Sequence, residues 1–176
     1  AEARRLAEGV MKAFHLNWDR DRRCCENFNP FTGEGSDVCD SDGFYSWTLL
    51  LPALWSMEYF DCNSWTGTTF GSLSGEDFSL TGLPLASGVH AVSCRDGVTA
   101  VTRDGREIFT SDLPGRFYEF VYEPHHCHVR LDPTRDGSVS FPGVLPKAVV
   151  VSGEAGPLLS RIPLKAGRPA EVDIWY

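Results

Sequence analysis

The pattern of hydrophobic and polar positions divides this chain into a helical part and a β-rich part. In residues 1–14, Leu6, Val10 and Phe14 recur at helical spacing among charged residues, which predicts an amphipathic helix. Residues 43–60 predict a second helix, hydrophobic on nearly every face. Helices of that kind are normally buried on all sides.

The second predicted helix is interrupted by Pro52, which lacks a backbone donor and crowds the preceding turn, so we expect a kink there. Pro52 and Glu58 also shorten the hydrophobic run below the roughly 20 residues that a membrane span requires. We therefore expect no membrane partner.

From about residue 63 onward, short runs are separated by Gly, Pro and Asp. Asp96-Gly97 and Asp104-Gly105 lie between β-branched runs and predict tight hairpins. Residues 70–75 are interpreted as the crossover between the helical and β parts. The fold class is α+β, with an antiparallel β-sandwich-like or jelly-roll-like domain over residues 63–176. Strands are expected at residues 89–92, 98–102, 107–110, 117–122, 127–131, 139–141, 148–151 and 171–175.

Charge limits the classes of partner. The formal charge of −8 at pH 7 argues against nonspecific nucleic-acid binding, which requires many Lys and Arg to neutralise phosphates. The basic residues Arg20, Arg22 and Arg23 form a small cluster, but Asp19 and Asp21 alternate with them. A solvated ion-pair network is the preferred interpretation of this cluster, with an anion site as the alternative.

Residues 26–35 contain the candidate catalytic group. They read Glu-Asn-Phe-Asn-Pro-Phe-Thr-Gly-Glu-Gly, an aromatic and turn-rich stretch between the two predicted helices. Such a loop can fix a side chain and leave it exposed in a cleft. A general base that acts on a water molecule requires this placement, so Glu26 is the candidate base.

Together with Phe44-Tyr45-Ser46-Trp47, this stretch resembles glycoside hydrolase family 63 and the related trehalase-like and mannosylglycerate-hydrolase-like enzymes. In these enzymes such a Glu loop and a Trp-containing helix form the last part of an (α/α)6 toroid. The resemblance implies that residues 1–62 are the last helices of such a toroid. It further implies that Glu26 is the base of an inverting glycosidase, that Phe28 and Trp47 line the site, and that the substrate is a carbohydrate.

An inverting glycosidase also needs a general acid, roughly 6.5 to 9.5 Å from the base. In the family this acid is an Asp far upstream of the matching segment. The resemblance therefore implies that an upstream helical segment or a partner chain supplies it, and that this chain alone is inactive. Asp37, Asp40 and Asp42 are closer candidates, but they directly precede the hydrophobic run, and helix capping is the preferred interpretation.

A noncatalytic carbohydrate-binding or protein-interaction module remains the alternative. Several aromatic residues of the β-rich part could stack on sugar rings, although aromatic residues in strands more often belong to the core. They are Trp65, Phe70, Phe78, Tyr118, Tyr122, Trp175 and Tyr176.

The remaining candidates for chemistry are histidines and cysteines. In the run 125–128, strand geometry places only His126 and His128 on one face, and two ligands do not complete a zinc site, so no metal and no cofactor is predicted. Cys24 and Cys25 are interpreted as small packing residues, and a bridge from one of them to Cys39 is left open. The absence of an Asn-x-Ser/Thr acceptor slightly favours a cytoplasmic location.

Overall fold

The chain folds as two compact units. The computed structural model describes residues 2–35, 42–63 and 65–176. We call residues 1–58 the helical unit and residues 59–176 the β unit. Within the described residues, no helix has both the length and the hydrophobicity needed to cross a membrane.

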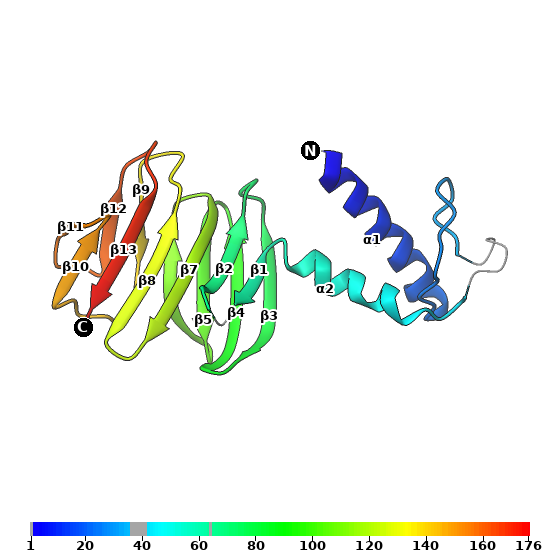
Figure 1. Cartoon of the computed structure of the whole chain (residues 1–176), viewed down its shortest axis with the longest axis horizontal. Helices are drawn as coiled ribbons and strands as arrows, with labels where there is room; N and C mark the ends of the chain where they lie inside the picture. Colours follow the sequence, from blue (N-terminus) through cyan, green and yellow to red (C-terminus); the bar gives the residue numbers. More distant parts are fainter. Residues whose placement is uncertain (1, 36–41, 64) are drawn as a thin grey trace. The chain divides into compact units, whose positions relative to one another are not determined.

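The helical unit consists of α1 (Glu2–Asp21), the 3-10 helix η1 (Ser46–Leu50) and the short helix α2 (Leu51–Ser56), drawn in Figure 1. Helix α1 is longer than the predicted 1–14, because the residues that follow Phe14 are compatible with a helix as far as Asp21. There Arg22 adopts a left-handed φ of 57° and donates its N–H to the Trp18 carbonyl at 2.9 Å. This αL cap ends the helix.

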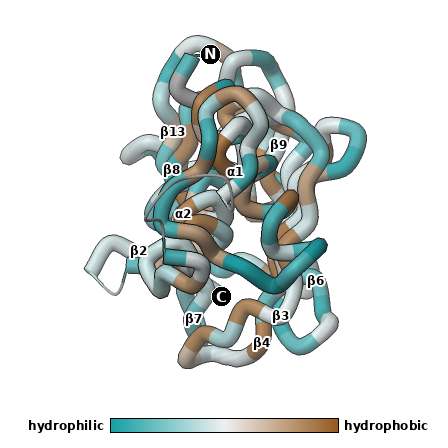
Figure 2. The backbone as a smooth tube through the Cα atoms, turned by 90° about the vertical axis from the view of Figure 1, so that its right-hand side faces the viewer, coloured by the Kyte–Doolittle hydropathy of each residue, from teal (hydrophilic) through white to brown (hydrophobic). Residues whose placement is uncertain are grey.

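The prediction of one continuous helix over residues 43–60 is wrong. Pro52 lies in the first turn of α2, where its missing N–H costs no hydrogen bond, so it starts a helix instead of kinking one. The segment is not buried on all sides either, since Trp47 is 69% exposed, Leu54 is 60% exposed and α2 has no buried residue. Figure 2 colours the chain by hydropathy, with the most hydrophobic residues in brown. The segment therefore presents hydrophobic surface that the described residues of the helical unit leave largely uncovered.

The β unit is an antiparallel sandwich of two sheets. The first has the strand order β1-β2-β7-β8-β13-β10-β11 and the second β12-β9-β6-β5-β4-β3, as Figure 1 shows. The strands are β1 (Phe60–Asn63), β2 (Gly67–Ser72), β3 (Phe78–Leu85), β4 (Gly88–Arg95), β5 (Val98–Arg103), β6 (Arg106–Ser111), β7 (Gly115–Glu123), β8 (His126–Leu131), β9 (Gly137–Ser140), β10 (Ala148–Val151), β11 (Glu154–Ala155), β12 (Arg161–Leu164) and β13 (Ala170–Trp175).

The sequence predicted much of this unit correctly. Each of the eight expected strands overlaps an observed strand, and the sandwich-like antiparallel fold is confirmed. The two Asp-Gly hairpins are also confirmed. The φ angles are 50° and 75° at Asp96 and Gly97, and 52° and 77° at Asp104 and Gly105. Both angles of each pair are positive, as a type I′ turn requires.

The interpretation of residues 70–75 as a crossover is wrong, because residues 67–72 form β2, which pairs with β1 and β7. Phe70 is fully buried in this strand. Gly71, with a φ of 101°, lies so close to β7 that a Cβ there would overlap the Gly115 carbonyl oxygen. Glycine is therefore required at this point of the sheet, and it does not end the strand.

A cluster of phenylalanines forms the centre of the sandwich. The Phe109 ring lies 5.4 Å from Phe70 and 5.2 Å from Phe117, edge to face in both pairs. Phe120 and Phe141 complete the cluster, each with its ring 5.4 Å from Phe109. Such pairs add about 0.5–1.5 kcal/mol each to the free energy gained by burying the rings.

Asp112 fastens the loop after β6 to the neighbouring strands. It accepts hydrogen bonds from the Ser138 N–H at 2.6 Å and from the Arg161 guanidinium at 2.9 Å. Burial opposes ionisation of Asp112, but the bonds from Ser138 and Arg161 outweigh it and lower the pKa of this carboxyl. The ionised carboxylate therefore stabilises this end of the β unit.

Candidate functional site

The backbone on both sides of Glu26 is held by the segment that leads into η1. The Glu26 N–H donates to the Asp42 carbonyl at 3.0 Å, and the Tyr45 N–H donates to the Cys24 carbonyl at 2.7 Å. The hydroxyl of Thr48 donates to the Cys25 carbonyl at 2.9 Å. These three bonds join two segments that are about 20 residues apart in sequence.

The residues after Glu26 close into a tight turn around Asn29. The side-chain oxygen of Asn29 accepts from the N–H groups of Phe31 at 2.9 Å and Thr32 at 3.2 Å. The Asn29 carbonyl accepts from the Gly33 N–H at 2.8 Å, and the Asn29 N–H donates to the Glu34 carbonyl at 2.8 Å. The Asn-Pro-Phe-Thr-Gly stretch therefore forms a closed turn, as its turn residues suggest.

Asn17 of α1 anchors the far end of this turn. Its side chain is completely buried and donates to the Gly33 carbonyl at 2.9 Å and to the Ala13 carbonyl at 2.8 Å. Its oxygen accepts from the Gly35 N–H at 3.1 Å. One amide thus satisfies two backbone groups of the loop, which would otherwise be unpaired next to the helix.

The loop packs tightly on two buried cysteines. Cys24 is fully buried and Cys25 is 1% exposed. A Cβ at Gly35 would overlap the Cys25 sulfur, so only glycine fits there. The interpretation of both cysteines as packing residues agrees with this burial. Both are free thiols, and Cys39 lies outside the described residues.

A group of exposed ion pairs connects the loop to the end of α1. The Arg20 guanidinium contacts both carboxylate oxygens of Glu34, at 2.7 and 2.8 Å, and also bonds Asp21 at 2.7 Å. The hydrogen bond from Arg20 lowers the pKa of Glu34. Arg22 pairs with Asp19 at 3.9 Å. For Arg20 and Arg22, the predicted ion-pair network is therefore confirmed.

Glu26 differs from these paired carboxylates. Its side chain is exposed, and it makes no hydrogen bond or ion pair with any residue that the structure describes. Trp47, 69% exposed, belongs to the same neighbouring segment as Thr48, while Phe28 is half-buried on the loop itself. The fixed backbone thus presents a carboxylate with no partner among the described residues, next to a segment that carries an exposed indole.

The capping interpretation is wrong for Asp42. Its side chain accepts from the Phe44 N–H at 2.9 Å, which forms a local turn, whereas the residue that precedes η1 is Tyr45, with no side-chain cap. Asp37 and Asp40 lie outside the described residues.

The β unit has a separate open cleft of about 770 Å³. Trp65 lies at this cleft and is 93% exposed, and its backbone N–H donates to the Asn63 side-chain oxygen at 2.8 Å. Thr68, Ser87 and Tyr122 also line it. An exposed indole at a cleft that also presents hydroxyl groups is suited to stacking on a sugar ring.

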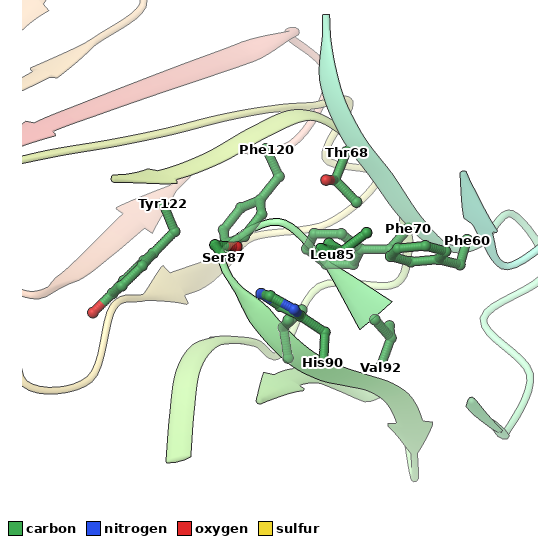
Figure 3. Close-up of a pocket in the computed structure, with 10 residues that line it drawn as sticks. Phe60, Thr68, Phe70, Leu85, Ser87, His90, Val92, Phe120 and Tyr122 are labelled. Atoms are coloured by element: carbon green, nitrogen blue, oxygen red, sulfur yellow. The ribbon is translucent and has the colours of Figure 1, made fainter. Parts of the chain in front are cut away.

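A smaller cavity lies between the two sheets, and Figure 3 shows side chains from both pointing toward it. Its volume of about 50 Å³ admits water but no sugar. His90 lines it and is 6% exposed, with Nδ1 3.0 Å from the Gly88 carbonyl. We therefore exclude this cavity as a substrate site.

Sequence reasoning identified the exposed groups of the loop but not the residues that hold it. Asn17 and Thr48 were missed, although an Asn on the same helical face as Ala13 is an unusual residue to bury.

No known protein family, curated protein or solved structure matches this chain.

Proposed function

We propose that this chain is the C-terminal part of an inverting glycoside hydrolase, with Glu26 as the general base. The observation that supports this most directly is the exposed Glu26 carboxylate, which has no partner among the described residues, on a loop whose backbone is fixed by the Asp42, Tyr45 and Thr48 bonds. A general base must be held in place yet remain accessible to water and substrate.

In the proposed reaction, a water molecule attacks the anomeric carbon through its oxygen, and Glu26 accepts a proton from that water. The bond from that carbon to the leaving oxygen breaks, and a carboxylic acid on the opposite side protonates the leaving oxygen. We propose that this acid comes from an upstream helical segment or a partner chain. The hydrophobic surface of the η1–α2 segment supports further helices packing there as the rest of an (α/α)6 toroid.

The decisive experiment compares Glu26→Gln with Glu34→Gln in the complete assembly that contains this chain. Both substitutions remove one carboxylate from the same loop, but only the first removes the proposed base. We expect Glu26→Gln to abolish hydrolysis of disaccharides and aryl glycosides without changing the circular dichroism spectrum. Glu34→Gln should keep most of the activity. Full activity in Glu26→Gln would refute the assignment.

Phe28 and Trp47 are proposed to line the sugar site. The exposure of Trp47 on the segment beside Glu26 supports this role. Trp47→Ala should raise KM more than it lowers kcat, since stacking binds the ground state and the transition state to a similar extent. Substitution of Phe31, which is 96% exposed at the tip of the turn, is the matched control.

The alternative function is noncatalytic binding of carbohydrate by the β unit. The exposure of Trp65 at the open cleft favours it specifically. In that case Trp65→Ala should weaken binding to oligosaccharides, while Glu26→Gln should not. Trp175→Ala is the control, because Trp175 is also partly exposed but stacks on His126 and does not line the cleft.

A further inference from the structure

Two histidines and one aspartate converge on the outer face of the seven-stranded sheet. His126 and His128 are alternate residues of β8, and Asp173 of β13 is the register partner of His128. The residues between them point the other way and are buried in the core. These are Cys127, Val129, Val172 and Ile174, all 0% exposed.

The donor atoms of the three side chains are already close together. One oxygen of Asp173, Oδ1, lies 2.9 Å from His126 Nε2 and 3.0 Å from His128 Nδ1. Donor atoms of His128, Glu171 and Asp173 also lie within 4.8 Å of one another. Bonds of about 2.0–2.2 Å to one metal ion place neighbouring donors about 3.0–3.5 Å apart. His128, Glu171 and Asp173 thus already form a group at ligand distance, and an ion bound there would replace the two hydrogen bonds to Asp173 while His126 turns toward it.

The two imidazole rings are oriented by contacts on their other sides. The ring of His126 stacks on Trp175, with 5.2 Å between centroids and an interplanar angle of 24°. His128 Nε2, the nitrogen that faces away from Asp173, is 4.0 Å from a carboxylate oxygen of Glu119. A metal-bound histidine typically donates its second N–H to a carboxylate, which fixes the tautomer and strengthens the ligand.

The neighbouring cation is already neutralised. Arg130, two residues after His128 on β8, contacts Glu119 at 2.9 Å and stacks on Tyr118, with its guanidinium carbon 5.5 Å from the ring centroid. The side chains of His128 and Asp173 are 13% and 20% exposed, so an ion between them would be reachable from solvent yet partly shielded. Cys127, the residue between the two histidines, is 0% exposed and turned into the core, so it does not reach this face.

We propose that His126, His128 and Asp173 bind one divalent transition-metal ion, with Glu171 as a fourth ligand. Two imidazoles and one carboxylate suit zinc, cobalt or nickel, whereas calcium and magnesium prefer sites made only of oxygen. The count of two ligands on β8 alone did not include Asp173, because Asp173 lies 45 residues from His128 in the chain. The proposal does not depend on the function proposed for Glu26.

The test is a calorimetric titration of the whole chain with Co²⁺, carried out in a Cys62→Ser background because Cys62 is an exposed free thiol. We expect one equivalent to bind and affinity to fall at least tenfold in His126→Ala, in His128→Ala and in Asp173→Asn. His125→Ala is the matched control and should bind as the parent does. The visible spectrum of bound cobalt should show nitrogen and oxygen ligation without thiolate charge transfer.

A second readout does not require the variants to fold. In the parent protein, paramagnetic Co²⁺ should broaden the ring signals of His126 and His128 before that of His90. Zn²⁺ should also raise the unfolding temperature of the parent, because a ligand that binds only the folded state stabilises it. Absence of stoichiometric binding, unchanged affinity in all three variants, or broadening that spares both histidines would overturn the proposal. In that event the three side chains form only a hydrogen-bonded cluster.

Discussion

Replacing Asn17 by Ala is the sharpest test of how the Glu26 loop is held. The substitution removes the donor to the Gly33 carbonyl and the acceptor for the Gly35 N–H. The Ala13 carbonyl is little affected, because it keeps its bond within the helix. Two loop groups next to α1 thereby lose their partners.

The magnitude follows from the burial of these groups. A buried polar group left without a partner costs about 1–3 kcal/mol. Gly35 is buried, whereas Gly33 is half-buried and can be reached by water, so we expect a total near the lower end, about 2–3 kcal/mol. Since 1.4 kcal/mol corresponds to a factor of ten, the open population of the loop should rise roughly 30- to 150-fold.

Thiol labelling can measure this opening directly. Cys25 lies beneath Gly35 and is 1% exposed, so a small alkylating reagent reaches it only when the loop opens. Peptide mapping by mass spectrometry would follow the labelling rate of Cys25, with the exposed Cys62 as an internal reference. The expected result is a labelling rate at Cys25 that increases by the factor given above.

The matched control is Lys12→Ala, which changes an exposed residue of the same helix to the same side chain. It should leave the Cys25 rate unchanged. If Asn17→Ala labels Cys25 within threefold of the parent rate while α1 remains helical, the amide of Asn17 does not hold the loop. The anchoring argument would then have to be abandoned.

Three further predictions concern the β unit. Phe109→Ala should lower the free energy of unfolding, measured by urea denaturation, by about 3–5 kcal/mol, because it leaves a cavity in the core. Leu145→Ala is the control, since that side chain is 85% exposed, and it should change the free energy of unfolding by less than about 0.5 kcal/mol. Folding lowers the pKa of Asp112, so the stability that its carboxylate contributes is present above the unfolded pKa near 4 and is lost as pH falls through the folded value. The parent should therefore lose more of its free energy of unfolding between pH 7 and pH 3 than Asp112→Asn does. Equal losses in the two proteins would contradict this. Gly71→Ala should be far more destabilising than Gly105→Ala. Both glycines have a positive φ, but only a Cβ at Gly71 meets neighbouring backbone. Equal melting temperatures of the two variants would refute the packing argument.

The sequence predicted those parts of the fold in which local chemistry decides the structure. Asp96-Gly97 and Asp104-Gly105 demand positive φ, and the β-branched runs beside them alternate correctly, so the hairpins followed from residues adjacent in the chain. Residues 70–75 were misjudged as a crossover because their glycines suggested a break, whereas the close approach of β7, from residues 115 to 123, requires Gly71. A long-range contact of this kind leaves no local pattern.

In the candidate sites, too, local patterns could be predicted from the sequence and long-range contacts could not. Glu26 could be found because the turn residues around it are contiguous, but its anchor Asn17 lies on another element and interacts through a buried amide. In the His126 and His128 cluster, strand alternation correctly predicted a shared face. The third group, Asp173, depends on the pairing of β8 with β13, which no periodicity reveals.

The strand order of the sandwich also affects how the β unit can assemble during synthesis. Strands β3, β4 and β5 each pair with the next strand in sequence, so these hairpins can close as soon as they emerge, and of the strands β3 to β6 only β6 has a later partner, β9. Strand β2 must instead wait for β7, which follows only after that whole meander has been made. Until then one edge of β2 lacks its partner, although the other edge can already pair with β1. The first sheet is therefore the late-forming half of the unit, and the open edge of β2 is the one most exposed to mispairing with other chains.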